Sequence, residues 1–451
     1  MSARHESARN TSARYVIVGS GIAGLSAAES IRANDRTASI TMLSVERGPF
    51  YSRPGLAYML TGEVPDEQLT IRSARDVDAL RVERRHGRAV QVDAAAREVI
   101  CDDGARVPWD RLLIATGAES VRAGFPGEEL DGVVHVDGLE EARDFVQRTS
   151  SAAGAVVVGG GSTALELVEG LHARGVATHY LMRGERYWAK VFDAVESAIV
   201  EARLIHDGVA LHRFTSVRRA IGEDGRLVGV ETTTGERIPC TLLAVAVGIR
   251  PRLALARSAG LASDRGILVN EFLESSLPGV YAAGDVAQVF DPVTGVSLLD
   301  TLWASALQQG RTAGLNMGGR RVPHRKRVPI NVTRVAGITT TIIGAVGAAD
   351  DPDLLTLTRG QSERWARDPD AWVVSGARVG DRLRVMVSGR AIVGAVVMGD
   401  QRASHALAHL VGEAVDIAAL RPALNTDAES AMDLLLAFCD EHVDDDAAEH
   451  R

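Results

Sequence analysis

The stretch Tyr15-Val16-Ile17-Val18-Gly19-Ser20-Gly21-Ile22-Ala23-Gly24 decides how this chain is expected to fold. Its first four residues form a short apolar run, which indicates a strand covered on both faces of a parallel sheet. Apolar residues then recur at helical spacing from Leu25 to Arg32. Gly19 permits a tight turn, Gly21 lets the backbone approach a pyrophosphate, and Gly24 lets the helix pack close to the strand. Because a diphosphate is favoured at the positive N-terminal end of a helix, the stretch predicts a dinucleotide site.

An acidic residue follows at the distance that such a site requires. A second strand is expected at residues 39–45, and Glu46 closes it. In a dinucleotide-binding fold, an acid about 20 residues beyond the turn binds the adenosine ribose. A glycine-rich turn in an unrelated α/β protein is the alternative, and Glu46 makes the dinucleotide interpretation the stronger one.

A second turn of the same kind lies about 140 residues further on. Gly159-Gly160-Gly161-Ser162-Thr163-Ala164 follows the apolar run 155–158, and alanine in the last place is an accepted variant. The ribose acid is absent, because Met182 stands in its place and Arg183 follows. Since arginine accommodates a 2′-phosphate, the pattern favours NADPH over NADH; the alternative is that Arg183 and Arg186 are solvated surface residues. Two turns indicate one cofactor that delivers electrons and one that receives them.

Three further segments complete an ordered set of motifs. Leu112-Leu113-Ile114-Ala115-Thr116-Gly117-Ala118 precedes the second turn, Val247-Gly248-Ile249-Arg250-Pro251 follows it, and Gly279-Val280-Tyr281-Ala282-Ala283-Gly284-Asp285 comes last. With the two turns, the set resembles the pyridine nucleotide-disulfide oxidoreductase class of FAD enzymes over nearly the whole chain.

The resemblance implies the fold and the cofactors. It implies an α/β protein with two doubly wound dinucleotide-binding domains, for FAD and NAD(P)H, and a mixed αβ C-terminal interface domain. The motif order places the FAD-binding domain at 14–120 and 250–325, the NAD(P)H-binding domain at 121–249, the interface domain at 328–440, and tails at 1–13 and 441–451. The implied cofactor-binding residues are Gly19, Gly21, Ala23, Gly24, Glu46, Arg53, Thr116, Gly117, Gly159, Gly161, Ser162, Thr163, Glu166, Arg183, Gly248, Gly284, Asp285 and Trp303.

No side chain stands out as an acid, base or nucleophile, and the resemblance implies three candidates near the flavin. These are Arg53, Glu166 and Trp303; the acid that matches Asp285 bonds the ribityl chain in relatives. The segments around Arg53 and Trp303 resemble those of rubredoxin and ferredoxin reductases and of the flavin half of nitrite reductases. The alternatives are a turn arginine paired with a surface acid, an ordinary helix carboxylate and a core tryptophan.

The cysteines indicate which branch of this class the chain resembles. Disulfide-reducing relatives carry redox cysteines in the stretch that here runs from Pro49 to Leu56 and contains none. Cys101, Cys240 and Cys439 are widely spaced and form no Cys-x-x-Cys pattern for exchange, zinc or an iron-sulfur cluster. Electrons are therefore expected to leave the flavin directly, and no metal site is expected.

Composition narrows the partners. The formal net charge of −9 argues against nucleic-acid binding, because a polyanion would be repelled. No run approaches the roughly 18 apolar residues of a membrane span. A cytoplasmic enzyme is expected. The resemblance to this class of FAD enzymes adds the expectation of a homodimer, because the C-terminal domain often mediates dimerisation in relatives. Residues from Arg359 to Asp370 are polar and are expected to form an exposed loop.

The expected function is a ping-pong transfer of hydride from NAD(P)H to flavin and then of electrons to a small redox protein such as a ferredoxin or rubredoxin. The basic run Arg320-Arg321-Val322-Pro323-His324-Arg325-Lys326-Arg327 is a candidate dock for an acidic carrier, or else a solvated face. The alternatives are a reductase of a small molecule (oxygen, quinone, nitro or nitrogen-oxide compound) and a flavin-binding redox sensor.

Overall fold

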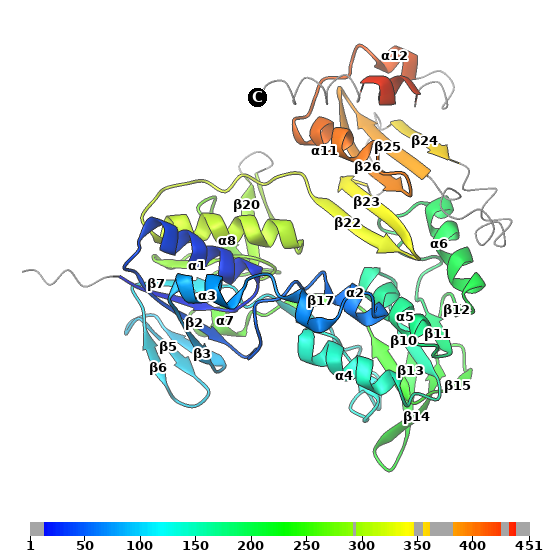
Figure 1. Ribbon diagram of the computed structural model, residues 1–451, viewed down its shortest axis with the longest axis horizontal. Helices are drawn as coiled ribbons and strands as arrows, with labels where there is room; N and C mark the ends of the chain where they lie inside the picture. Colours follow the sequence, from blue (N-terminus) through cyan, green and yellow to red (C-terminus); the bar gives the residue numbers. More distant parts are fainter. Residues whose placement is uncertain (1–12, 292–294, 347–354, 361–381, 425–432, 439–451) are drawn as a thin grey trace, which may run out of the picture. The chain divides into compact units, whose positions relative to one another are not determined.

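The computed structural model describes residues 13–291, 295–346, 355–360, 382–424 and 433–438 (Figure 1). The chain divides into two compact units. Unit 1 comprises residues 1–55, 65–119 and 249–326, and unit 2 comprises residues 56–64, 120–248 and 327–451. The sequence prediction differs in two respects, since it assigned residues 56–64 to the FAD-binding domain and treated the C-terminal domain as a separate body. The predicted tails lie outside the described residues, except for Ala13.

Unit 1 is built on a parallel five-stranded sheet in the order β19-β7-β1-β2-β3. Its core strands are apolar on both faces, as the sequence predicted. The helices α1 and α8 lie side by side over the sheet (Figure 1). A Cβ at Gly310 of α8 would lie 2.2 Å from the carbonyl oxygen of Ala23, so the two helices pack at backbone distance. The bounds are β1 Arg14–Val18, α1 Ile22–Asn34, β2 Ser39–Ser44, α3 Ala74–Leu80, β3 Val82–His86, β7 Arg111–Ile114, β19 Val280–Ala282 and α8 Trp303–Met317.

Smaller elements complete unit 1. Two three-stranded sheets pack beside the main one, in the orders β4-β5-β6 and β18-β20-β21, and the ribbon β8-β17 lies where the chain passes between the units. The bounds are η1 Asp66–Leu69, β4 Ala89–Asp93, β5 Glu98–Cys101, β6 Arg106–Pro108, β8 Ala118–Ser120, β17 Ile249–Pro251, α7 Ala254–Ser258, β18 Ile267–Val269, β20 Ala287–Asp291 and β21 Val296–Leu299.

Unit 2 repeats the parallel arrangement in the order β12-β11-β10-β16-β9. The antiparallel sheet β13-β14-β15 contributes to one apolar core with strands β10, β11 and β16. The bounds are α2 Leu56–Thr61, β9 Val133–Val134, α4 Leu139–Thr149, β10 Ala155–Val158, α5 Ser162–Ala173, β11 Thr178–Leu181, α6 Ala194–His206, β12 Ala210–His212, β13 Val217–Glu223, β14 Arg226–Thr232, β15 Arg237–Pro239 and β16 Leu242–Val245.

The C-terminal part of unit 2 is an antiparallel sheet in the order β22-β23-β26-β25-β24, and α11 packs on β23 and β26. Its bounds are β22 Ile330–Val335, β23 Ile338–Gly344, β24 Leu355–Gly360, β25 Arg382–Ser388, β26 Ala391–Met398, α11 Ser404–Gly412 and α12 Arg421–Leu424. The loop predicted from Arg359 to Asp370 is wrong at its start, because Arg359 and Gly360 pair with β25. The remainder of that segment lies outside the described residues.

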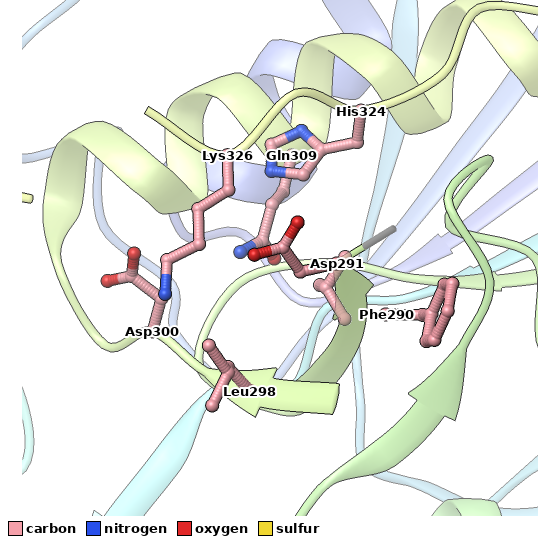
Figure 2. A pocket seen from close by; sticks show the side chains of 8 residues that line it. Phe290, Asp291, Leu298, Asp300, Gln309, His324 and Lys326 are labelled. Atoms are coloured by element: carbon pink, nitrogen blue, oxygen red, sulfur yellow. The ribbon is translucent and has the colours of Figure 1, made fainter. Parts of the chain in front are cut away.

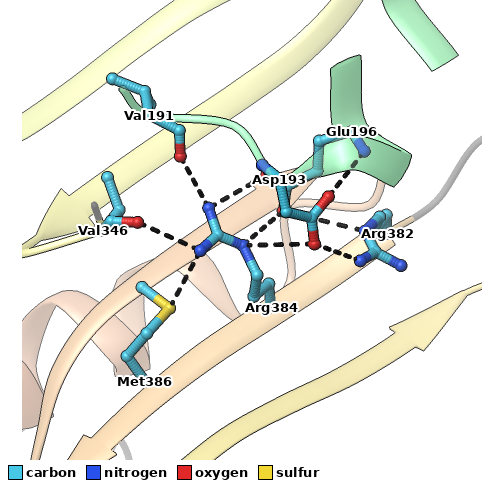
Figure 3. Close-up of polar contacts among 7 residues, drawn as sticks. All are labelled: Val191, Asp193, Glu196, Val346, Arg382, Arg384 and Met386. Atoms are coloured by element: carbon cyan, nitrogen blue, oxygen red, sulfur yellow. Dashed lines mark hydrogen bonds and ion pairs between the residues drawn. The ribbon is translucent and has the colours of Figure 1, made fainter. Parts of the chain in front are cut away.

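A buried ionic network joins β25 to the start of α6 (Figure 3). Arg384 donates to both carboxylate oxygens of Glu196, at 2.8 and 3.0 Å, and to the carbonyl of Val191 at 2.7 Å. Arg382 donates to Asp193 at 2.6 Å. Glu196 has no exposed surface, so the guanidinium of Arg384 compensates a carboxylate that could not be buried alone.

Candidate functional site

The first glycine-rich turn lies at the carboxyl edge of the sheet of unit 1. Gly19 has a φ of +119°, and a Cβ there would lie 2.1 Å from the carbonyl oxygen of Ala115. A Cβ at Gly24 would lie 2.1 Å from the carbonyl oxygen of Gly19. A Cβ at Gly21, in contrast, meets nothing within 4 Å. Gly19 and Gly24 are therefore required by the fold itself, whereas Gly21 faces open space that a ligand can enter.

The helix that follows has a free N-terminus at which an anion can bind. α1 begins after Gly21, and no described side chain caps it or places an acid in its first turn. Its first N–H groups therefore lack the side-chain acceptors that a helix normally uses. By comparison, α6 is closed by a capping box between Asp193 and Glu196. The open cradle above Gly21 and the uncapped N–H groups fit the diphosphate of a dinucleotide.

The acid predicted for the ribose lies beside the predicted flavin arginine. Arg53 donates to Glu46 at 2.5 Å, and the Tyr51 hydroxyl donates to the same carboxylate at 3.2 Å. Burial raises the pKa of Asp285, against the positive charges of Arg53 and Arg252. The structure thus brings Glu46, Arg53 and Asp285 into one electrostatic cluster at the edge of the sheet. The alternative interpretation of Arg53, a turn arginine paired with an acid, is also met, because Arg53 pairs with Glu46.

The other predicted residues of unit 1 lie around this cluster. Gly284 donates its N–H to the side-chain oxygen of Gln309 at 2.8 Å, inside the protein. The carbonyl of Gly117 accepts from the N–H of Arg252 at 3.0 Å, and Thr116 donates to the carbonyl of Arg252 at 3.3 Å. Ala23 is buried in the first turn of α1. Trp303 begins α8 and packs, half-buried, against the core of unit 1.

The sequence analysis gave no individual role to Gln309 or Arg252, which bond to predicted site residues, although the segment that contains Gln309 resembles the helix that closes the FAD site in relatives. Gln309 belongs to the Gln308-Gln309-Gly310 segment, whose glycine is the place where α8 meets α1, so a signal was present. Arg252 follows the Arg250-Pro251 segment, but nothing in its local sequence shows that it reaches residues 116 and 117.

A small cavity in unit 1 is lined in part by Gln309, the acceptor of the Gly284 N–H (Figure 2). Its volume is about 20 Å³, close to the space that one water molecule needs. It is lined by Val289, Phe290, Asp291, Leu298, Asp300, Gln309, His324 and Lys326. Burial lowers the pKa of His324, so its imidazole is neutral at pH 7. The cavity is far too small for a ring system of a cofactor.

The second turn, in unit 2, repeats the geometry of the first. Gly159 has a φ of +155°, and a Cβ there would lie 2.2 Å from the carbonyl oxygen of Ala246. A Cβ at Gly161 meets nothing within 4 Å, and no described side chain caps α5. Ser162 and Thr163 are the first residues of α5, and Gly248 accepts from the N–H of Val121 at 2.9 Å. The cradle therefore fits a second diphosphate.

The ribose position of the second site differs from that of the first. Met182 is buried, with 1 % of its surface exposed, and so cannot contact a ribose. Arg183 follows it and is exposed, while Arg186 pairs with Glu185 at 3.2 Å. Arg183 is the free basic group at this point of the described chain.

Two carboxyl groups line α5. Burial raises the pKa of Glu166. Burial also raises the pKa of Glu169 to about 7, although its carboxylate accepts from the N–H of Gly337 at 3.1 Å. Glu166 lies in the second turn of α5, close to the cradle in sequence.

The described residues define the class of protein. Two uncapped, glycine-lined turns at the carboxyl edges of two parallel sheets indicate a protein that binds two dinucleotides. Among the described residues no cluster of three or more His, Cys, Asp or Glu is placed to hold a metal ion, and no helix there has the length and apolarity that crossing a membrane requires.

Comparison with known proteins identifies the family. Residues 13–310 match the family described as pyridine nucleotide-disulphide oxidoreductase, and the chain belongs to it. The chain is similar to the rhodocoxin reductase of Rhodococcus erythropolis, with 31% identity over 70% of this chain and 74% of that protein. The nitrite reductase [NAD(P)H] of Bacillus subtilis is 24% identical over 90% of this chain and 48% of its own length. The predicted class is confirmed, and the protein is an FAD-containing, NAD(P)H-dependent oxidoreductase.

A solved structure supports the fold. The chain superposes on putidaredoxin reductase, in its covalent complex with putidaredoxin, with a TM-score of 0.79. The sequences are 21% identical, and the match covers 90% of this chain and 94% of that one. The predicted α/β architecture of two dinucleotide-binding domains and a C-terminal domain is therefore confirmed.

Proposed function

We propose that this protein passes electrons from NADPH through its flavin to a small acidic redox carrier. The observation that carries the proposal is the missing internal acceptor. The stretch from Pro49 to Leu56 holds no cysteine, and the described cysteines Cys101 and Cys240 are free and buried. Two relatives are named for their carriers, which supports a protein acceptor.

FAD, when bound, accepts hydride and releases electrons. The chain supplies position and charge. In the proposed site the turn at Gly19 to Gly24 holds the diphosphate, Glu46 holds the ribose, and Asp285 lies beside Arg53 for the flavin side of the cofactor. The guanidinium of Arg53 provides fixed positive charge, which stabilises negative charge that develops in a dry site. The turn at Gly159 to Ala164 holds the nicotinamide nucleotide, with Arg183 at its 2′-phosphate.

The carrier is proposed to dock on the basic run. Arg325, Lys326 and Arg327 are exposed, and none of them forms an ion pair with another described residue. Opposite charge accelerates the encounter of two proteins, and salt screens that effect. An acidic ferredoxin-like or rubredoxin-like protein is the matching partner. A cytoplasmic location and a homodimer are part of the proposal, as is the absence of nucleic-acid and membrane partners.

The test uses the holoenzyme with Arg325, Lys326 and Arg327 all changed to Ser. Reduction of a panel of acidic carriers is expected to fall about tenfold at low salt and to lose its salt dependence. Flavin reduction by NADPH in stopped flow is expected to stay unchanged. A matched triple change of Arg218, Arg226 and Arg237 to Ser, on the β13-β14-β15 sheet, removes the same charge elsewhere. If the two triple variants reduced the carriers at the same rate, the docking surface would be rejected. Rapid turnover with oxygen, quinones or nitro compounds, and with no carrier protein, would favour a small-molecule reductase.

A further inference from the structure

An exposed phenylalanine stands next to the proposed ribose position of unit 2. Strand β12 ends at His212, and Phe214 follows at the carboxyl edge of the sheet. The N–H of Phe214 donates to the carbonyl of Gly184 at 3.1 Å, and the N–H of Thr215 donates to the carbonyl of Met182 at 2.9 Å. These two bonds fix Phe214 against the chain on both sides of Arg183.

Phe214 is unusual in two independent ways. Phe214 has 69 % of its surface exposed, the highest fraction among the large apolar residues for which the structure describes exposure. Its φ is +53°, in the left-handed region that bulky residues rarely adopt. Residues held in such strained conformations cluster at binding sites, where the surrounding structure keeps them in place. Packing does not account for the ring, because most of it faces solvent.

The neighbouring groups indicate what the ring could bind. In open parallel sheets, ligands bind beyond the carboxyl ends of the strands. Arg183 is exposed and free to meet a phosphate, whereas the guanidinium of Arg213 is held by Glu201. A flat apolar surface beside a free cation suits a purine base that carries a phosphorylated ribose. Aromatic side chains stack on bases of any kind and bind them more tightly as a result.

We propose that Phe214 is the platform on which the adenine ring of the nicotinamide nucleotide stacks, with Arg183 beside it at the ribose. The inference rests on the proposed nicotinamide site at Gly159 to Ala164. Phe214 is a positioning residue: it binds the half of the nucleotide that takes no part in hydride transfer.

Fragments of the nucleotide separate this role from chemistry. 2′,5′-ADP and 5′-ADP carry the adenosine half, and reduced nicotinamide mononucleotide carries the reacting half. In the holoenzyme, Phe214→Ala is expected to weaken the binding of the adenosine fragments about tenfold in calorimetry. The same variant is expected to raise the KM for NADPH by a similar factor and to leave the KM for reduced nicotinamide mononucleotide unchanged. Phe214→Tyr keeps the ring and is expected to bind as the natural protein does.

Two controls guard against a merely structural effect. Phe214→Gly relieves the backbone strain, so it is expected to raise the Tm and still to bind the adenosine fragments as weakly as Phe214→Ala. Ile205→Ala removes another exposed apolar side chain. Ile205 lies at the end of α6, just before β12 begins, so it stands at the amino edge of the sheet, opposite Phe214. It is expected to change neither affinity.

Unchanged affinity for both adenosine fragments in Phe214→Ala and Phe214→Gly would overturn the inference. It would also be overturned if these variants changed only the self-association of the protein, measured by sedimentation. Flavin reduction by NADPH in the natural protein, and its reoxidation by carriers, test the proposed function separately, because calorimetry of the fragments needs no turnover.

Discussion

The two glycine-rich turns have the same backbone and different surroundings. Each has a first glycine at positive φ pressed against a carbonyl oxygen, and a later glycine open to solvent. Beyond the next strand, unit 1 presents the carboxylate of Glu46, whereas unit 2 buries Met182 and presents Arg183. The comparison teaches that one backbone arrangement can be followed by side chains of opposite charge, and we propose that these side chains select the nucleotide.

The largest effect is expected from the first glycine of each turn. Gly19→Ala and Gly159→Ala would each drive a Cβ into a carbonyl oxygen at 2.1 and 2.2 Å. We expect each to cost more than about 4 kcal/mol of folding free energy, in the range of exceptional single substitutions. Soluble yield and thermal unfolding measure the loss. A normal Tm in either variant would show that the turn is not held by this contact.

The next effect concerns the ionic network of unit 2, for which Figure 3 shows the geometry. Arg384→Ala leaves Glu196 buried without its partner, and breaking such a pair typically costs about 3–5 kcal/mol. Denaturant unfolding measures it. The exposed pair of Arg390 and Asp416 provides the control, because Arg390→Ala is expected to leave the unfolding midpoint almost unchanged. Similar midpoints for the two variants would contradict the assignment.

The open glycines should separate the two sites functionally. Gly21→Val and Gly161→Val place a side chain where nothing lies within 4 Å, so both proteins are expected to fold. Gly21→Val is expected to be purified without flavin colour. Gly161→Val is expected to stay yellow, with its KM for NADPH raised about 100-fold because the diphosphate loses its helix N-terminus. Absorbance at the flavin band and stopped-flow reduction distinguish them; a reversed pattern would exchange the two assignments.

The basic group at the second ribose should set nucleotide preference. Arg183→Ala is expected to lower the ratio of kcat/KM for NADPH to that for NADH about tenfold, since a hydrogen bond to a charged group is worth ~1.5–3 kcal/mol. Steady-state kinetics with both nucleotides measure the ratio. Arg218→Ala, on β13, is the control of equal charge. A ratio unaffected by Arg183→Ala would leave Arg183 as a surface residue.

The smallest effect is a pH dependence in unit 2. Burial raises the pKa of Glu169 to about 7, above its ordinary value of 4.5. Between these values the folded protein binds more protons than the unfolded chain, so this group makes stability fall as pH rises from about 4.5 to 7. Glu169→Gln keeps an acceptor for the N–H of Gly337 and is expected to be more stable than the natural protein at pH 8 and equally stable at pH 4. Parallel unfolding curves at both pH values would contradict the shift.

The sequence predicted the two turns well because their physical requirements are local. A strand, a glycine at positive φ and a helix follow one another within ten residues, so the pattern is visible without the fold. The pairing of Gly284 with Gln309 was not visible, because it joins residues 25 apart through the packing of α8 on α1. The joining of residues 56–64 to unit 2 was missed for the same reason, since Leu60 meets Gly170 of α5.

By itself, the sequence determined the class of protein, its two cofactors and the absence of a cysteine acceptor beside the flavin segment. Those conclusions depend on residue types at short spacings, which the covalent chain imposes directly. Only the tertiary structure decided that Arg53 meets Glu46, that Met182 is buried beside an exposed Arg183, and that Phe214 stands at the same edge of the sheet. These relations depend on which strands pair and which helices pack, and many distant contacts determine them together.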